Sequence, residues 1–149
     1  MARVDYRAIA EALRDALAAD AALMGVTLAI DADQEFAIDQ ARFVGIYTVG
    51  RRPTSGQPLA ASTRVRYEVE FLLWCAVHHP ETFADAAKAR DDLVGAVEVA
   101  LLTAAPSFMQ GAAILRLPGG GPLESFRHNA GAFLATGDVS VTVEVVATT

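Results

Sequence analysis

The longest alternation of apolar and polar residues runs from Thr63 to His78. Every second residue is apolar, while the opposite positions are charged in the first half and apolar in the second half. The first set comprises Val65, Tyr67, Val69, Phe71, Leu73, Cys75 and Val77, and the second comprises Arg64, Arg66, Glu68, Glu70, Leu72, Trp74 and Ala76. A period of two predicts one β-strand. We expect its first half to have a solvated face and its second half to be covered on both faces.

The length of this strand is unusual for a small domain. At about 3.3 Å per residue it would span roughly 50 Å. We therefore expect part of it to project beyond its own core with open backbone donors and acceptors. Because such strands are usually covered by another chain, the pattern favours assembly over catalysis.

Helical spacing marks two other segments. Residues 3–19 have an apolar stripe through Ile9, Leu13 and Leu17, which predicts an amphipathic helix. A second helix is expected after His79, Pro80 and Glu81 and before Pro106. Its apolar stripe comprises Leu93, Ala96, Val97, Ala100 and Leu101, and Gly95 within it is interpreted as a position of close packing.

Shorter strands and turns complete the pattern. Strands are expected at residues 26–30, 42–49, 112–117 and 138–147, with a short strand at 132–135 and a turn at 136–138. Two segments rich in proline and glycine predict a long loop at residues 50–62 and a flexible loop at residues 118–125. The long loop would connect strands 42–49 and 63–78 as an antiparallel hairpin.

These elements predict an α+β fold, in which two helices pack on one face of a mostly antiparallel sheet and one long hairpin strand projects. The 149 residues, 53% of them hydrophobic, fit a single domain spanning residues 1–149. We expect neither a membrane-spanning helix nor a signal peptide, and hence folding in the cytoplasm.

Composition changes the functional picture in one respect. A formal net charge of −6 argues against general nucleic-acid binding, because that binding needs a basic surface. The single Cys75 lies on the apolar side of the long strand, where a thiol packs as a small hydrophobic group.

Reactive constellations are not evident in the sequence. His78 and His79 are adjacent, so on a strand they point to opposite faces, and we interpret them as ending the strand and capping the next helix. The glycines of residues 118–122 lack the lysine and hydroxyl residue of a phosphate loop. We predict no catalytic residues, no metal site and no cofactor. An enzyme would require His78, His79 or His128 to meet carboxylates in a cleft.

The densest cationic cluster comprises Arg51, Arg52, Arg64 and Arg66, which a hairpin would bring together at the base of the long loop. These arginines would contact an acidic partner surface or passing DNA. The alternative is that they pair with Glu68, Glu70 and the carboxylates of residues 31–39. Because surface ion pairs stabilise a fold only weakly, such clustering is not required for folding.

The order of elements resembles the tail terminator proteins of long-tailed bacteriophages and phage-like gene transfer particles. The resemblance comprises chain length, the first helix, the hairpin leading into residues 63–77, a helix at 85–103 and the last strand at 138–147. It covers most of the chain but includes no invariant motif. A neck or tail-completion protein of related fold, a head-tail connector, would have the same pattern.

The resemblance implies a non-enzymatic virion protein at the tail-neck junction, made in the bacterial host. It implies a homo-oligomeric ring, usually a hexamer, that caps the tail tube protein, ends tube elongation and offers a joining surface to head-tail connector proteins. DNA would pass through the lumen without specific binding, and no membrane would be involved. A different possibility is a small-molecule-binding α+β module, with Trp74 and Tyr47 lining its pocket.

Overall fold

The computed structural model describes residues 4–32, 41–53, 64–79, 82–127 and 133–148. Two α-helices, two short 3-10 helices and five strands form in this part of the chain. In chain order they are α1 (Tyr6–Ala18), η1 (Ala21–Leu23), β1 (Thr27–Ile30), β2 (Arg42–Pro53), β3 (Arg64–His79), α3 (Phe83–Ala104), η2 (Ala105–Gly111), β4 (Ala113–Arg127) and β5 (Phe133–Thr148).

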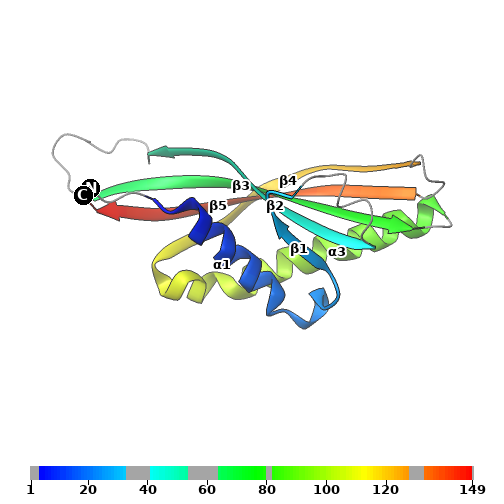
Figure 1. Ribbon diagram of the computed structural model, residues 1–149, viewed down its shortest axis with the longest axis horizontal. Helices are drawn as coiled ribbons and strands as arrows, with labels where there is room; N and C mark the ends of the chain where they lie inside the picture. The colour runs from blue at the N-terminus through cyan, green and yellow to red at the C-terminus, as the bar shows by residue number, and fades with distance from the viewer. Residues whose placement is uncertain (1–3, 33–40, 54–63, 80–81, 128–132, 149) are drawn as a thin grey trace.

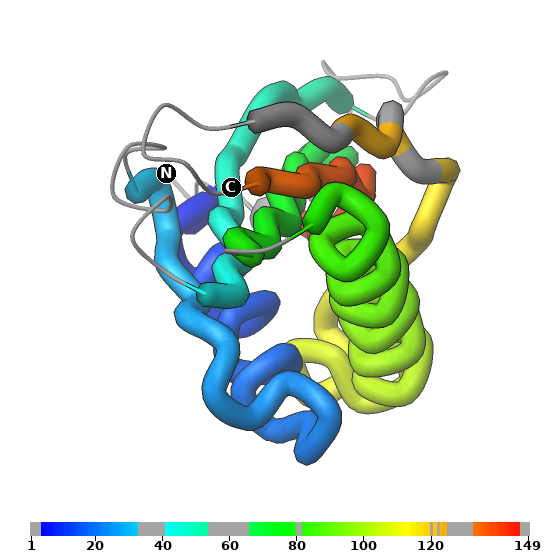
Figure 2. The backbone as a smooth tube through the Cα atoms, turned by 90° about the vertical axis from the view of Figure 1, so that its right-hand side faces the viewer, coloured from blue at the N-terminus to red at the C-terminus, as the bar shows by residue number. Residues whose placement is uncertain are grey.

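The strands form one mixed sheet in the order β1-β2-β3-β5-β4. Strand β1 runs parallel to β2, and every other neighbouring pair is antiparallel. Both helices lie on the same face of the sheet, with α1 over β1 and β2 and α3 over β3, β5 and β4 (Figures 1 and 2). This confirms the predicted α+β fold with two helices on one face.

Strand β3 is a single unbroken strand of 16 residues, as its alternation predicts. It pairs with β5 from Arg64 opposite Thr148 to His79 opposite Phe133, and with β2 over most of the same length. The expectation of open backbone groups on β3 is therefore wrong, because both neighbours come from its own chain. The ends of β2, β3 and β5 do extend together past the helical layer (Figure 1).

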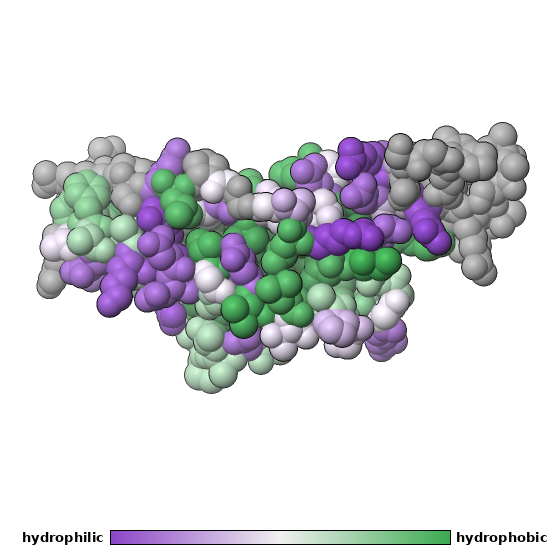
Figure 3. Space-filling view, turned by 180° about the vertical axis from the view of Figure 1, so that it is seen from behind, coloured by the Kyte–Doolittle hydropathy of each residue, from purple (hydrophilic) through white to green (hydrophobic). Residues whose placement is uncertain are grey.

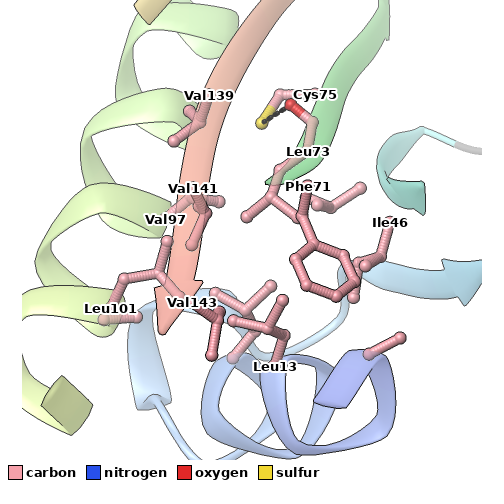
Figure 4. Packing of buried hydrophobic residues seen from close by; sticks show 14 of the residues in the cluster. Leu13, Ile46, Phe71, Leu73, Cys75, Val97, Leu101, Val139, Val141 and Val143 are labelled. Atoms are coloured by element: carbon pink, nitrogen blue, oxygen red, sulfur yellow. Dashed lines mark hydrogen bonds between the residues drawn. The ribbon is translucent and has the colours of Figure 1, made fainter. Parts of the chain in front are cut away.

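Period-two alternation decides which side chains of β3 enter the core. Val69, Phe71, Leu73, Cys75 and Val77 face the helices and are buried. They pack against β5, α1 and α3, and the core of this face contains Leu13, Leu17, Val97, Leu101, Val139, Val141 and Val143 among others (Figure 4).

The opposite face of the sheet, called here the outer face, is covered unevenly. Along β3, Arg66 and Glu70 are exposed, Leu72 and Trp74 are partly buried, and Ala76 is fully buried. Ala76 belongs to a second, smaller apolar cluster with Phe43 and Leu134. The predicted change from a solvated to a covered face along β3 is therefore present, although Leu72 and Trp74 keep some exposure.

Side-chain caps start both helices. The Asp5 carboxylate accepts a hydrogen bond from the Ala8 amide at 3.0 Å, and the Thr82 hydroxyl accepts one from the Asp85 amide at 3.1 Å. Each cap satisfies a backbone donor that has no partner within the helix. The cap of α3 is therefore Thr82, and the interpretation of His78 and His79 as its cap is wrong.

Three predicted loop or turn segments are strands instead. Residues 50–53 extend β2, so the expected loop at 50–62 begins later, and residues 54–62 lie outside the described chain. Residues 118–125 belong to β4, and residues 136–138 lie within β5. Of the short strand expected at 132–135, residues 133–135 form the start of β5, and residue 132 lies outside the described chain. These segments have weak strand patterns of their own, but pairing with a neighbouring strand gives their backbone groups hydrogen-bond partners.

Strand β4 is irregular at two places near its proline- and glycine-rich residues 118–122. Its register with β5 shifts between Arg116 and Gly119 and again between Gly120 and Leu123. The buried guanidinium of Arg90 on α3 donates to the Glu124 carbonyl at 2.8 Å, beyond the second shift. This bond ties the far half of β4 to the helical layer.

Glycine at 137 allows close helix–sheet packing rather than a turn. A Cβ there would lie 2.7 Å from Leu123 Cδ2 and 3.0 Å from Val94 Cγ2. By contrast, a Cβ at Gly95 would meet nothing within 4 Å among the described residues. The interpretation of Gly95 as a position of close packing is therefore not supported within this chain.

The segment Phe83–Gly111 is long and apolar enough to cross a membrane by length and composition alone. The prediction that the sequence contains no segment apolar enough to span a membrane is therefore wrong. However, Leu93, Val97 and Leu101 are buried against the sheet, and the backbone leaves helical geometry at Phe108. We interpret the segment as the core helix of the domain, followed by a kinked turn.

Candidate interaction surface

Two glutamates face each other on the outer face, near the end of the sheet where β3 begins. The register of β3 and β5 places Glu68 directly opposite Glu144, and their side chains are only 25% and 13% exposed. Like charges at directly opposed positions destabilise a sheet. The arrangement therefore depends on nearby cations.

Three arginines from three strands supply these cations. Arg52 Nε on β2 lies 3.2 Å from Glu68 Oε2, and Arg116 Nη1 on β4 lies 2.8 Å from Glu144 Oε2. Arg66 Nη1 on β3 lies 3.9 Å from the other carboxylate oxygen of Glu144. The arginine side chains are 76%, 50% and 63% exposed, in that order. The exposed guanidinium groups thus pair with carboxylates that lie closer to the sheet and are largely shielded from solvent.

A groove of about 530 Å³ adjoins this network, between β2 and β4, which flank β3 and β5 in the sheet; Arg52, Glu68 and Arg116 line it, and Arg66 and Glu144 lie beside it. We call it the arginine–glutamate groove. Its lining comprises Gly50, Arg51, Arg52, Glu68, Glu70, Arg116, Leu117, Pro118 and Thr142. Strand irregularities lie on both sides, at Thr48/Gly50 in β2 and after Arg116 in β4.

The four arginines of the predicted cluster divide between different surroundings. Arg52 and Arg66 share the outer face. Arg51 Nη1 instead donates to the Tyr6 hydroxyl on α1 at 2.7 Å, and its guanidinium lies 5.4 Å from the centroid of the Tyr6 ring. The backbone of Arg64 pairs with Thr148, and its side chain lies outside the described part of the structure.

Arg116 belongs to the network but was missed by sequence reasoning. It is distant in sequence from the other arginines, and only the pairing of β4 with β5 brings it near Glu144. A signal was present in residues 112–117, where Ile114 and Arg116 alternate with Leu115 and Leu117. That alternation identifies the outward side of the strand but not its neighbour. The predicted pairing of arginines with Glu68 is found for Arg52.

The reactive groups considered in the sequence lie elsewhere. Burial, and then the charges of Asp138 and Glu98, raises the pKa of the Cys75 thiol to about 12, so this thiol stays protonated and unreactive at neutral pH. His78 and His79 lie on successive positions of β3, and His128 is outside the described residues. The described residues bring together no group of three or more His, Cys, Asp or Glu suited to a metal ion.

Tyr47 and Trp74 do not line the groove described above. The Tyr47 hydroxyl donates to the Ala32 carbonyl at 2.7 Å, and Trp74 packs edge-to-face on Phe43 with ring centroids 6.1 Å apart. A smaller recess of about 190 Å³ lies where the start of α1 approaches η2 and β5, and its lining includes neither residue. The two aromatic rings thus pack within the outer face.

A separate apolar surface lies on α3. Val99 and Leu102 are 59% and 62% exposed, on the side of the helix opposite the buried Val97 and Leu101. Figure 3 shows an apolar area in the middle of the back of the molecule, the side on which α3 and β4 lie (Figure 2). A contiguous exposed apolar patch is typical of contact with another protein.

Comparison with known proteins leaves this geometry without a family assignment. No protein-family model matches the chain, and no curated protein matches it.

Proposed function

We propose that this chain is a structural virion protein that assembles into a ring, usually of six subunits. The ring caps a tail tube, ends its elongation and presents a joining surface to the head connector. One observation carries the proposal: α3 turns Val99 and Leu102 away from the core of its own chain. A partner that covered these side chains would remove apolar surface from water.

The arrangement of the sheet favours a head-to-tail contact. Among the described residues, two edges lack a neighbouring strand: the outer edge of β4, and the β1-side edge of β2 beyond Ile46, where β2 pairs only with β3. These edges lie on opposite sides of the sheet, with α3 on the β4 side and α1 on the β1 side. A contact between two different sides of identical subunits produces a closed ring or an open filament.

The remaining parts of the proposal follow from the resemblance of the element order. The ring would sit at the tail-neck junction, contact the tail tube protein and the connector proteins, and let DNA pass through its lumen. The formal net charge of −6 is compatible with a lumen that does not retain DNA.

The first experiment measures assembly. The purified chain is expected to form particles of about six subunits with a central hole, by mass photometry and negative-stain microscopy. Val99→Glu combined with Leu102→Glu should yield folded monomers, because it introduces charge into the proposed contact. Ala84→Glu, exposed on the first turn of the same helix, is the matched control and should leave the ring intact. A chain that stays monomeric at all concentrations would refute the ring.

The second experiment separates a terminator from a neck or tail-completion protein. Addition of the ring to polymerising tail tube protein from the same particle should stop tube growth. Binding to the connector without any effect on tube length would instead assign the chain to the neck.

A further inference from the structure

We propose that the arginine–glutamate groove binds an acidic segment of a partner polypeptide, and that Glu144 positions Arg116 in the groove and Arg66 beside it. The identification of that partner with the tail tube or the connector rests on the proposed function, whereas the chemistry of the groove does not. Three features carry the inference: the opposed glutamates, the exposure of the arginines, and the local charge.

Glu144 lies within ion-pair distance of two guanidinium groups and accepts a hydrogen bond from one of them, Arg116. Its two carboxylate oxygens face Arg116 at 2.8 Å and Arg66 at 3.9 Å, and its side chain is largely shielded from solvent. Arg52 is held in the same way by Glu68. A guanidinium has five N–H donors, and the bond to the glutamate uses one nitrogen of Arg52 and one of Arg116, so their exposed heads can donate further. Arginines already ordered in this way lose less side-chain entropy on binding a carboxylate.

The local charge favours an anionic partner. On the outer face Arg52, Arg66 and Arg116 balance Glu68, Glu70 and Glu144 in number. However, the three arginine side chains are 50–76% exposed while Glu68 and Glu144 are only 25% and 13% exposed, so mainly positive groups reach the solvent. The whole chain carries −6. The groove thus presents mainly positive groups on an acidic molecule, and complementary potentials steer association and set its orientation.

The groove fits spaced carboxylates better than a phosphate backbone. Glu68, Glu70 and Glu144 would repel a continuous polyanion, and counterion release requires a more strongly basic surface. Arg52 and Arg116 lie on the two strands that flank β3 and β5, so three strand spacings, about 14 Å, separate them across the sheet. Acidic residues four apart in an extended peptide are separated by about 13 Å. One such segment would therefore reach both arginines.

The test uses a fluorescent peptide of about twelve residues, with two glutamates four positions apart in an otherwise uncharged sequence, long enough to cross the groove at about 3.3 Å per residue. Fluorescence anisotropy should show binding that weakens as salt is added. Arg52→Ala combined with Arg116→Ala should lower the affinity by about tenfold or more, since it removes two charged contacts. Arg7→Ala combined with Arg14→Ala removes two exposed, ion-paired arginines from α1 and should leave the affinity unchanged.

Glu144→Gln tests positioning against charge by the sign of its effect. The variant makes the groove more positive, so a purely electrostatic groove would bind the acidic peptide more tightly. If Glu144 positions Arg66 and Arg116, the variant binds more weakly even though its unfolding midpoint hardly changes, and Glu144→Asp restores part of the affinity. Tighter binding by Glu144→Gln would overturn the positioning role.

Other outcomes would overturn the choice of partner. Absence of peptide binding, equal loss in the α1 control, or tighter binding of a DNA duplex than of the peptide would each refute an acidic polypeptide ligand. Subunit number is measured on the same samples, so the two proposals fail separately. If the chain forms a ring but does not bind the peptide, only this inference is refuted. If it stays monomeric and binds the peptide, only the ring is refuted.

Discussion

Truncation of the two large aromatic side chains in the middle of β3 would measure how differently the two faces of the sheet are buried. Phe71 points toward the helices and is completely enclosed, whereas Trp74, three residues later, points to the outer face and is partly buried. Alanine at either position leaves the pairing of β3 with β2 and β5 in place. The difference between the two variants therefore reports on side-chain burial.

The expected magnitudes follow from that burial. Phe71→Ala creates an enclosed cavity between β3, β5 and the helices, and such truncations cost about 3–5 kcal/mol. Trp74 contacts Phe43 with one ring edge and retains some exposure, so the space left by its removal is open to water. We expect Trp74→Ala to cost about 2 kcal/mol, below the range for a fully enclosed aromatic ring.

Urea unfolding followed by far-ultraviolet circular dichroism is the suitable assay, because Trp74 is the only tryptophan and its loss removes the fluorescence probe. A domain has only about 5–15 kcal/mol of stability, so Phe71→Leu, at about 1–1.5 kcal/mol, serves as a milder second variant. A cost for Trp74→Ala equal to or above that of Phe71→Ala would show that the outer face is as deeply covered as the helical face. The assignment of the core to one face would then be wrong.

Two further predictions concern a glycine pair and an acidic side chain. Gly137→Ala should lower the free energy of unfolding by about 1–3 kcal/mol, because the new methyl group would overlap with α3 and β4 contacts. Gly95→Ala, in an open position of α3, should raise it by up to about 1 kcal/mol, and a loss at Gly95 in the monomer would contradict the open environment. Burial, and then the nearby Glu124 carboxylate, raises the pKa of Asp138 above its usual 3.8, so its ionised form opposes folding as the pH rises. Asp138→Asn should therefore raise the thermal midpoint at neutral pH and lose this advantage as the pH falls from the raised pKa of Asp138 down to 3.8, and an advantage that persists below that pH would exclude this cause.

Local patterning was sufficient for the existence of the two helices and of β3 and for the side of each that enters the core, but not for the full extents of β2, β4 and β5. The alternation of residues 63–78 identified β3 and its inward residues, and the stripes in α1 and α3 identified the buried side of each helix. These features depend on periods of two and 3.6 residues, which are set by backbone geometry and can be read from neighbouring positions. The antiparallel hairpin predicted from residues 42–49 and 63–78 placed Arg52 near Arg66, and both lie on paired strands at the same end of the sheet.

Pairing between distant segments decided the rest. Strand β5 covers the backbone of β3 along its whole length, and it also holds the glycine-rich residues 118–122 in β4. A bulge in β2 helps to put Arg51 on the α1 side, while β4 brings Arg116 to Glu144. Periodicity in a sequence specifies which way a side chain points but not which strand lies beside it. The neighbours of β3, and with them the composition of the arginine–glutamate groove, therefore emerge only when the whole sheet has formed.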